Sequence, residues 1–382
     1  MDSDYLLVGG RLVLPEAVVE GGSLLVEAGR VARLFEPGAA LPAGVRRVDA
    51  AGAWVTPGLM EFHFHGAGGI GVDALGADAD EAAGNLRRLA AFLRERGVTA
   101  FMPTIVSEES AVERLAAGLE VAGFPSWTVP GIYVEGPFVN PAKRGGIPLE
   151  FLRSPDPAVF ERFRLAARGR LRVMTIAPEL PGAEALYEGF AAAGVLAALG
   201  HSEAVLGRFA APRAPFGLTH LFNAMSPFSH KDAGLAMLPF LDGRPFVELV
   251  SDGVHVNDET LAICARAFGA GRIILVSDAA CAAGLPSGEY DYFGRRIVSG
   301  ERGVRYADTD VLMGSRRFGP ELLRNWLRAT GRPVHEAVRA LSLTPRRTLG
   351  IDDRGAIASG QAAELVVWEG EFEAPRLVLG SG

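Results

Sequence analysis

The hydrophobic residues of this 382-residue chain follow two different patterns. Both ends carry short apolar runs bounded by glycine, proline and charged residues, as in Tyr5-Leu-Leu-Val near the start and Leu365-Val-Val-Trp near the end. Such runs predict strands. We therefore expect residues 1–54 and 352–382 to form one small β-sandwich domain that is built from both chain termini.

Between the two ends, apolar strands alternate with helical segments. Leu86, Leu89, Ala90 and Leu93 recur at the spacing of a helix over residues 80–96. Alternating strands and helices are typical of a parallel sheet. Eight strands are predicted, which favours a closed (β/α)8 TIM-like barrel over residues 55–351. They are expected at residues 54–65, 99–105, 129–135, 172–176, 195–199, 216–219, 246–250 and 272–276.

The composition excludes several classes of protein. Hydrophobic residues make up 49% of the chain, which is ample for a large core. The net charge is -7 and no long basic block occurs, so we expect no nucleic-acid partner. No apolar run approaches the roughly 20 residues of a membrane span, so no membrane partner is expected. Two cysteines, Cys264 and Cys281, and no leader pattern predict a cytoplasmic protein.

Histidines and carboxylates gather at the ends of the predicted strands. His63 and His65 occupy alternate positions of the first strand, so both imidazoles can point into the barrel. Because the carboxyl ends of barrel strands meet at one mouth, residues that are distant in sequence converge there. Each of these residues also has a structural reading as a core or capping residue, but together they favour a divalent metal site, with zinc preferred and iron as the alternative. The others are Glu135, His201, His220, His255 and Asp278.

The same residues suit the hydrolysis of an amide. A metal held by imidazoles and a carboxylate keeps a position open for water and lowers the pKa of that water from about 15.7 to about 7. A carboxylate must then take the water proton and deliver it to the leaving nitrogen. Asp278, after the last strand, is expected to be this base or a further ligand. His255 is the candidate donor to the developing oxyanion.

Several longer motifs contain these residues. The two most specific are Glu135-Gly-Pro-Phe-Val-Asn-Pro-Ala-Lys and Thr219-His-Leu-Phe-Asn-Ala-Met-Ser, supported by Gly200-His-Ser, Ser251-Asp-Gly-Val-His-Val and Val276-Ser-Asp-Ala. With these motifs the whole chain resembles the N-acetylglucosamine-6-phosphate deacetylases of the amidohydrolase superfamily. The resemblance implies a barrel with a small β domain, usually a homodimer. It also implies deacetylation of an N-acetyl amino-sugar phosphate, from N-acetylglucosamine-6-phosphate to glucosamine-6-phosphate and acetate.

The resemblance implies a role for each matched residue. Glu135, His201 and His220 would hold one metal ion. His63 and His65 would help to hold a second ion, with Glu135 shared, so that each chain binds one or two ions. Asp278 would be the catalytic aspartate, and His255 would contact the substrate near its reacting carbonyl. The expected substrate-binding set is completed by Asn223, Ala224, Lys231, Gly314 and Ser315.

Three departures from the family pattern fall in the substrate-recognition set. Ile147 stands where a histidine is usual, and Lys231 stands where an arginine contacts phosphate. The late motif reads Leu312-Met-Gly-Ser-Arg-Arg-Phe, in which Arg316 or Arg317 is either a solvated residue or a replacement phosphate clamp. Two alternatives therefore stay open. One is an amidohydrolase for an unphosphorylated or different N-acyl or cyclic amide, and the other is a metal-binding module without turnover.

Overall fold

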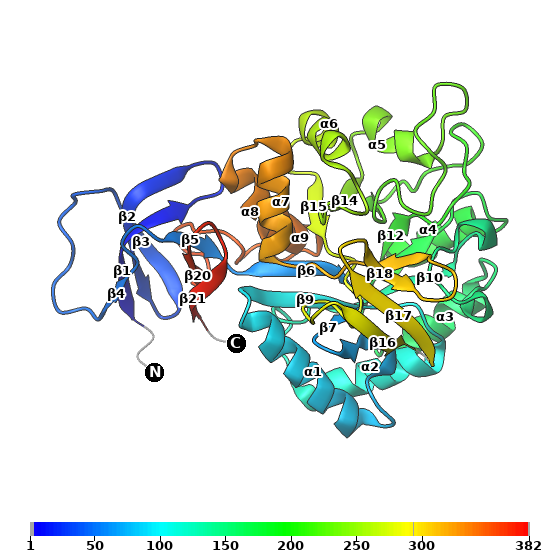
Figure 1. The fold of residues 1–382 in the computed structure, drawn as a ribbon, viewed down its shortest axis with the longest axis horizontal. Helices are drawn as coiled ribbons and strands as arrows, with labels where there is room; N and C mark the ends of the chain where they lie inside the picture. The colour runs from blue at the N-terminus through cyan, green and yellow to red at the C-terminus, as the bar shows by residue number, and fades with distance from the viewer. Residues whose placement is uncertain (1–3, 293, 381–382) are drawn as a thin grey trace.

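Eight parallel strands form the centre of the computed structural model, which describes residues 4–292 and 294–380 (Figure 1). Each strand is hydrogen-bonded to the next one along the chain. Almost every residue in these strands is buried, because a parallel sheet packs side chains on both of its faces. The strands are β6 (Leu59–Phe64), β9 (Val98–Ile105), β10 (Ile132–Phe138), β11 (Leu171–Ile176), β12 (Leu196–Leu199), β13 (Phe216–Leu218), β14 (Phe246–Val250) and β15 (Ile273–Val276).

Hydrogen bonds between the two edge strands close this sheet into a barrel. The His65 N–H donates to the Ala279 carbonyl at 2.9 Å, and the Asp278 N–H donates to the His63 carbonyl at 3.1 Å. The end of β6 therefore lies beside the residues that follow β15. The predicted (β/α)8 barrel is confirmed, and each of the eight predicted strands overlaps an observed one.

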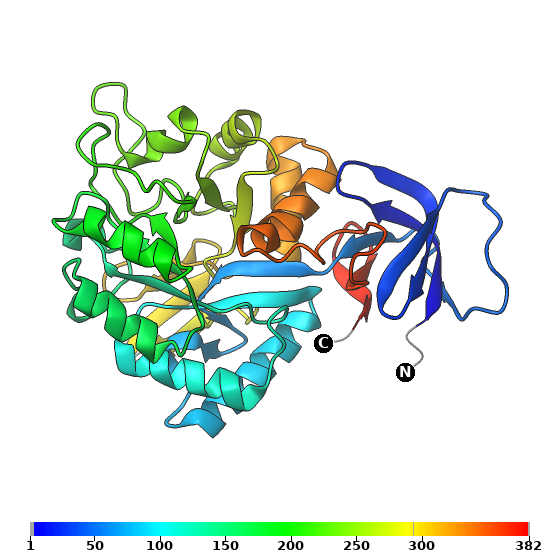
Figure 2. The same ribbon diagram turned by 180° about the vertical axis from the view of Figure 1, so that it is seen from behind.

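Helices cover the outside of the barrel, which Figure 2 shows from behind. In α1 (Ala79–Arg94), Leu86, Leu89 and Leu93 are buried, as their spacing predicts. Asp78 caps this helix by accepting a hydrogen bond from the Glu81 N–H. The other helices are α2 (Glu109–Ala122), α3 (Pro157–Ala166), α4 (Ala183–Ala192), α5 (Leu238–Leu241), α6 (Asp258–Phe268), α7 (Pro320–Thr330), α8 (Val334–Leu341) and α9 (Leu343–Thr348). No helix in the described ranges is long and apolar enough to cross a membrane.

Both ends of the chain join in a second, seven-stranded sheet beside the barrel (Figure 1). It has an apolar cluster of its own that includes Leu7, Val26 and Leu365. The sheet domain built from both termini is thus confirmed, while its limits at residues 54 and 352 stay a prediction. Its strands are β1 (Tyr5–Val13), β2 (Val18–Glu27), β3 (Arg30–Phe35), β4 (Arg47–Asp49), β5 (Trp54–Pro57), β20 (Leu365–Glu369) and β21 (Ala374–Leu379).

A four-stranded antiparallel sheet follows β15 and reaches the loops at the barrel mouth. The Tyr306 hydroxyl donates to the Gly146 carbonyl at 3.0 Å, and the Tyr292 hydroxyl donates to Asp73 at 3.1 Å. These bonds attach the sheet to the loops that follow β10 and β6. Its strands are β16 (Gly288–Tyr292), β17 (Arg295–Gly300), β18 (Gly303–Tyr306) and β19 (Leu312–Gly314).

A buried arginine connects the barrel to the terminal sheet. Arg346 in α9 is 1% exposed, and burial lowers the pKa of its guanidinium. It donates to the Gly58 carbonyl at 3.1 Å and to the Thr99 hydroxyl at 3.2 Å, and it lies 3.4 Å from the carboxylate of Glu364. Gly58 joins β5 to β6, and Glu364 precedes β20, so one side chain holds both parts together.

We predict that Arg346→Met lowers the free energy of unfolding by about 3–5 kcal/mol, because it leaves a buried carboxylate without its partner. Thermal and denaturant unfolding measure the change. Arg347→Met, at an exposed position of the same helix, should change stability by no more than about 0.5 kcal/mol. Equal effects of the two substitutions would contradict this role of Arg346.

Candidate active site

The predicted ligands come together at the carboxyl ends of the barrel strands. They belong to different strands or to the loops just after them, which explains how residues so far apart in sequence meet. The side chains in two groups lie close enough to share an ion, and all of them are buried. The groups are His63, His65 and Glu135, and Glu135, His201 and His220.

The second group is built around one oxygen of Glu135. Its Oε1 lies 2.9 Å from His201 Nε2 and 2.8 Å from His220 Nε2, and these two nitrogens are 3.0 Å apart. The Nδ1 of His201 lies 2.8 Å from the Lys143 carbonyl. Because a carbonyl only accepts, Nδ1 of His201 carries the proton, and its Nε2 turns a lone pair toward Glu135.

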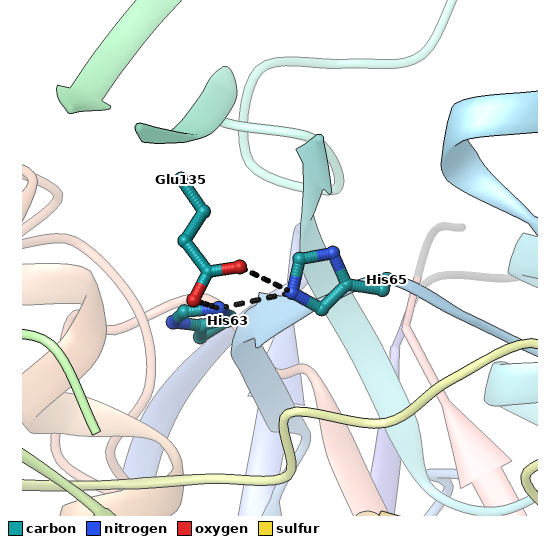
Figure 3. A group of neighbouring side chains, drawn as sticks. All are labelled: His63, His65 and Glu135. Carbon is teal, nitrogen blue, oxygen red and sulfur yellow. Dashed lines mark hydrogen bonds and ion pairs between the residues drawn. The ribbon is translucent and has the colours of Figure 1, made fainter. Parts of the chain in front are cut away.

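The first group shares the same carboxylate. Figure 3 shows the imidazoles of His63 and His65 turned toward Glu135. His65 Nε2 lies 3.2 Å from Glu135 Oε2, and His63 Nε2 lies 3.6 Å from Oε1. The two imidazole nitrogens are 3.2 Å apart. Glu135 is therefore the residue common to both groups.

This set of donors fits a divalent cation. The carboxylate of Glu135 is buried, and all four imidazoles turn an Nε2 atom toward it at 2.8–3.6 Å. Nδ1 of His65 and Nδ1 of His220 have no hydrogen-bond partner in the described ranges. The orientation of these two rings therefore depends on the contacts of their Nε2 atoms. Imidazole lone pairs that converge on a carboxylate need a positive charge between them.

Asp278 lies between the first group and His255. Its Oδ1 is 3.3 Å from His65 Nε2, and its Oδ2 is 3.7 Å from His255 Nε2. Asp252 accepts from the Nδ1 of His255 at 2.9 Å and also from its main-chain N–H at 2.9 Å. Burial would lower the pKa of His255, but the hydrogen bond and charge of Asp252 outweigh it and raise that pKa above its usual value.

The backbone is strained where three of these residues leave their strands. His201, His220 and Asp278 have φ values of 47°, 27° and 51°, in a region that side chains other than glycine rarely adopt. Such conformations concentrate at functional sites, where the surrounding structure holds them. Behind Asp278, Gly314 permits a close backbone approach, because a Cβ there would lie 2.8 Å from the Asp278 carbonyl.

A cavity of about 330 Å³ opens in front of these groups. Tyr292, Leu312 and Met313 of the four-stranded sheet form part of its wall. A substrate of the size of a sugar phosphate could therefore meet the candidate ligands and this sheet together. The remaining lining residues are His65, Val106, Glu135, Ala142, Lys143, Gly145, Gly146, Ile147, His201, His220, Asn223, Ala224, His255 and Asp278.

Of the residues that complete the predicted substrate-binding set, two line the cavity and the other three lie outside its lining among the described residues. Asn223 and Ala224 line the cavity. Lys231 is exposed and lies outside the lining among the described residues. Gly314 and Ser315 are buried behind Asp278, and the Ser315 N–H donates to the Asp278 carbonyl at 2.8 Å.

The two arginines of the late motif hold neighbouring loops. Arg316 donates to the Ser287 hydroxyl at 3.0 Å and to the Leu285 carbonyl at 3.4 Å. Arg317 donates to the carbonyl of Asp252. Neither arginine lines the cavity among the described residues. Both side chains therefore brace loops at the barrel mouth.

Several residues beneath the ligands are missing from the sequence prediction. Glu248 bonds His63 at 2.9 Å, and Tyr133 bonds Glu248 at 3.1 Å. Glu248 is the only charged residue in the fully buried strand β14, and a charge in such a position is itself a signal of a specific partner. Asp252 carries a weaker signal, since it precedes His255 by three residues in the Ser251-Asp-Gly-Val-His motif.

Comparison with known proteins agrees with this geometry. The sequence pattern of the Amidohydrolase family matches residues 54–379. The chain is 34% identical to the N-acetylglucosamine-6-phosphate deacetylase of Bos taurus, over 95% of this chain and 89% of that protein. It is 31% identical to the N-acetylgalactosamine-6-phosphate deacetylase of Escherichia coli O157:H7, over 95% and 94% of the two chains. The chain belongs to the N-acetylglucosamine-6-phosphate deacetylase family of amidohydrolases.

The solved structures of this family agree in fold as well. The structure of an N-acetyl-D-glucosamine-6-phosphate deacetylase variant from Mycobacterium smegmatis, in complex with N-acetyl-D-glucosamine-6-phosphate, superposes with a TM-score of 0.89. It is 30% identical and covers 99% of this chain and 98% of that one. The resemblance predicted from the motifs is confirmed, and the chain is a metal-dependent hydrolase of this family.

We predict that Asp252→Asn lowers the pKa of His255, because it removes the negative charge that favours the protonated ring. An opposite charge at this distance shifts a pKa by about 1–3 units. NMR titration of the His255 ring, with Asp278 and Arg305 as its other charged neighbours, measures the change. The control is Asp258→Asn, whose partner is Arg328 at the surface. An unchanged His255 titration in Asp252→Asn would show that another group sets its charge.

Proposed function

We propose that this chain hydrolyses N-acetylglucosamine-6-phosphate to glucosamine-6-phosphate and acetate. The observation that carries the proposal is the convergence of two histidine–carboxylate groups on Glu135, beside Asp278 and on the wall of one cavity. The names of the relatives add the substrate class. A binding module without turnover is disfavoured, because it has no use for a carboxylate beside the ligands.

The metal centre that we propose contains two ions. Glu135, His201 and His220 would hold one of them, and His63 and His65 would share Glu135 to hold the other, with Asp278 as a further ligand. Zinc is the ion that suits these imidazole and carboxylate donors best, and iron is the alternative. When bound, such ions lower the pKa of a coordinated water to about 7 and polarise a carbonyl.

Asp278 moves the proton in this proposal. Its Oδ2 lies 3.7 Å from Nε2 of His255, whose raised pKa favours the protonated ring. The carboxylate is therefore ionised and able to accept a proton from the attacking water. It then delivers that proton to the amide nitrogen, so that the amino sugar leaves as a neutral amine.

His255 stabilises the carbonyl oxygen of the substrate. Asp252 holds its Nδ1–H, which leaves Nε2 free to face the cavity. The raised pKa favours the protonated ring. An Nε2–H of this ring is then available to the oxygen as negative charge develops there during attack.

Lys143 is our candidate for the phosphate. It lines the cavity together with Asn223 and Ala224. Only two of the 38 lysine and arginine residues of the chain are lysines, and the other, Lys231, lies outside the lining. A lysine binds phosphate as a compact point charge. We retain Lys231 as a weaker contact of the phosphate, and Gly314 and Ser315 as residues that act through Asp278.

An unphosphorylated N-acyl amine is the second candidate substrate. Ile147 is 3% exposed and packs with Val106 and Val139. It therefore gives the cavity an apolar wall at the position where the family usually has a histidine. Such a wall offers no donor to a phosphate and would suit a substrate that lacks one.

We also propose that two chains form a homodimer and that the protein is cytoplasmic. Phe228, Leu241 and Ile263 are 54%, 72% and 53% exposed, and the first and last of these line an apolar groove. Exposed apolar surface of this kind marks interaction sites.

The buried, unpaired Cys264 and Cys281 suit a reducing compartment. Light scattering of the purified protein tests the dimer, and the location of a tagged chain in cells tests the compartment.

We predict that Asp278→Asn retains the fold but lowers kcat for the sugar phosphate by about 10²–10⁴, the contribution of a positioned acid–base group. Elemental analysis and circular dichroism check that metal and fold remain. Asp308→Asn changes an exposed aspartate paired with Arg295 and should keep full activity. Near-normal turnover in Asp278→Asn would mean that another group moves the proton.

We predict that Lys143→Ala raises KM for N-acetylglucosamine-6-phosphate by about 10- to 100-fold, the value of one charge-assisted bond. The backbone carbonyl that holds His201 is unchanged, so hydrolysis of unphosphorylated N-acetylglucosamine should stay as it is. Lys231→Ala should have a smaller effect. Parallel assays of the two sugars measure these changes. Equal kcat/KM of the unaltered protein for both sugars would favour the second candidate substrate.

A further inference from the structure

We propose that Glu248 is a positioning residue that keeps the two ligand groups of the metal centre in register. It would do so by fixing the ring of His63 and the backbone at His220. The inference rests on the metal centre proposed above. It extends that centre from the ligands to the residue behind them.

Glu248 lies in the middle of β14 and is fully buried. Its Oε2 accepts from His63 Nδ1–H at 2.9 Å and from the His220 N–H at 3.1 Å. Its Oε1 accepts from the Tyr133 hydroxyl at 3.1 Å. A buried carboxylate is costly unless donors surround it, and here three donors from three different strands or strand ends do so.

The hydrogen bond between His63 and Glu248 decides which nitrogen of the His63 ring faces the other candidate ligands. Because Nδ1 donates to Glu248, Nε2 carries the lone pair and points toward His65 and Glu135. A carboxylate behind a ligating histidine fixes its tautomer and orientation in this way. His65 has no such partner, since its Nδ1 is unbonded in the described part of the chain. A hydrogen bond at Nδ1 therefore fixes the orientation of the His63 ring but not that of the His65 ring.

The bonds to the His220 segment hold the second group. The side chain of Glu248 accepts from the His220 N–H, and its main-chain carbonyl accepts from the Leu221 N–H at 2.9 Å. His220 has a φ value of 27°. The main-chain bond from Leu221, which a substitution of the Glu248 side chain leaves in place, supports this conformation. Tyr133 links Glu248 onward to the Thr219 hydroxyl at 3.1 Å. The side chain of Glu248 thus contacts a ring of the first group, that of His63, and the main chain of the second group, at His220.

Loss of Glu248 should affect the two groups unequally. The ring of His63 loses the bond that orients it. The ring of His201 keeps its own bond to the Lys143 carbonyl, and the ring of His220 does not touch Glu248. The ion held by His63 and His65 should therefore weaken more than the ion held by His201 and His220. A residue that only stabilised the fold would weaken both ions alike.

The test is a titration of metal-free protein with Co²⁺, followed by visible absorption and elemental analysis. The unaltered chain should bind two ions. In Glu248→Ala the ion held by His201 and His220 should bind within about threefold of normal, and the ion held by His63 and His65 should bind about 10- to 100-fold more weakly. Glu248→Gln should recover most of this affinity, because its amide oxygen can still accept from His63. If the alanine variant does not fold, Glu248→Leu keeps the volume and serves the same purpose.

Two control variants isolate the effect. Glu61→Gln changes another buried glutamate on the same strand as His63, but Glu61 bonds the Ser277 hydroxyl and the Gly319 N–H. It should bind both ions normally. Tyr133→Phe removes one of the three donors to Glu248 and leaves the bond to His63, so it should have only a small effect.

Normal binding of both ions by Glu248→Ala or Glu248→Leu would overturn the proposal. So would an equal weakening of both ions that Glu248→Gln does not correct. A single ion bound by the unaltered chain would contradict the two-ion centre itself, and the role of Glu248 would fall with it. Failure of the proposed metal centre and failure of the Glu248 role are thus told apart.

Discussion

The candidate active site depends on one buried carboxylate that four imidazoles approach. Glu135 Oε1 lies within 3 Å of His201 Nε2 and His220 Nε2, and both of its oxygens face the His63 and His65 pair. Neutral imidazoles with their lone pairs turned inward cannot surround a carboxylate stably without a positive charge. For two of the rings, hydrogen bonds at Nδ1 settle which nitrogen carries the lone pair: His63 donates to Glu248, and His201 donates to the Lys143 carbonyl. The site is therefore organised around cations.

The barrel makes this concentration of polar groups tolerable. Its strands are buried and apolar along most of their length, and the candidate ligands lie toward or just beyond their carboxyl ends. Closure of the barrel brings β6 beside the residues after β15, so that His65 and Asp278 lie 3.3 Å apart although they are far apart in sequence. The fold supplies the positions, and the left-handed backbone at His201, His220 and Asp278 aims the side chains inward.

Much of this arrangement could be predicted from the sequence, because strand ends can be located from apolar runs. That rule placed the eight strands and brought His63, His65 and Glu135 to one mouth. The rule fails for residues whose role depends on contacts within the core. Glu248 is an example, because the sequence shows only a single charged residue in an apolar strand. The rule also fails for loops. Lys231 lies outside the cavity lining and Lys143 belongs to it, although the resemblance assigned the phosphate contact to Lys231.

Anomalous diffraction from crystals of the zinc-loaded protein tests this metal centre most directly. We predict two anomalous peaks, one among Glu135, His201 and His220 and one among His63, His65 and Glu135. Asp278 should lie beside the peak among His63, His65 and Glu135, and Glu248 should be bonded to His63 Nδ1. The absence of zinc from the Glu135–His201–His220 group, or zinc bound elsewhere in the chain, would contradict the claim that these residues form the catalytic metal centre.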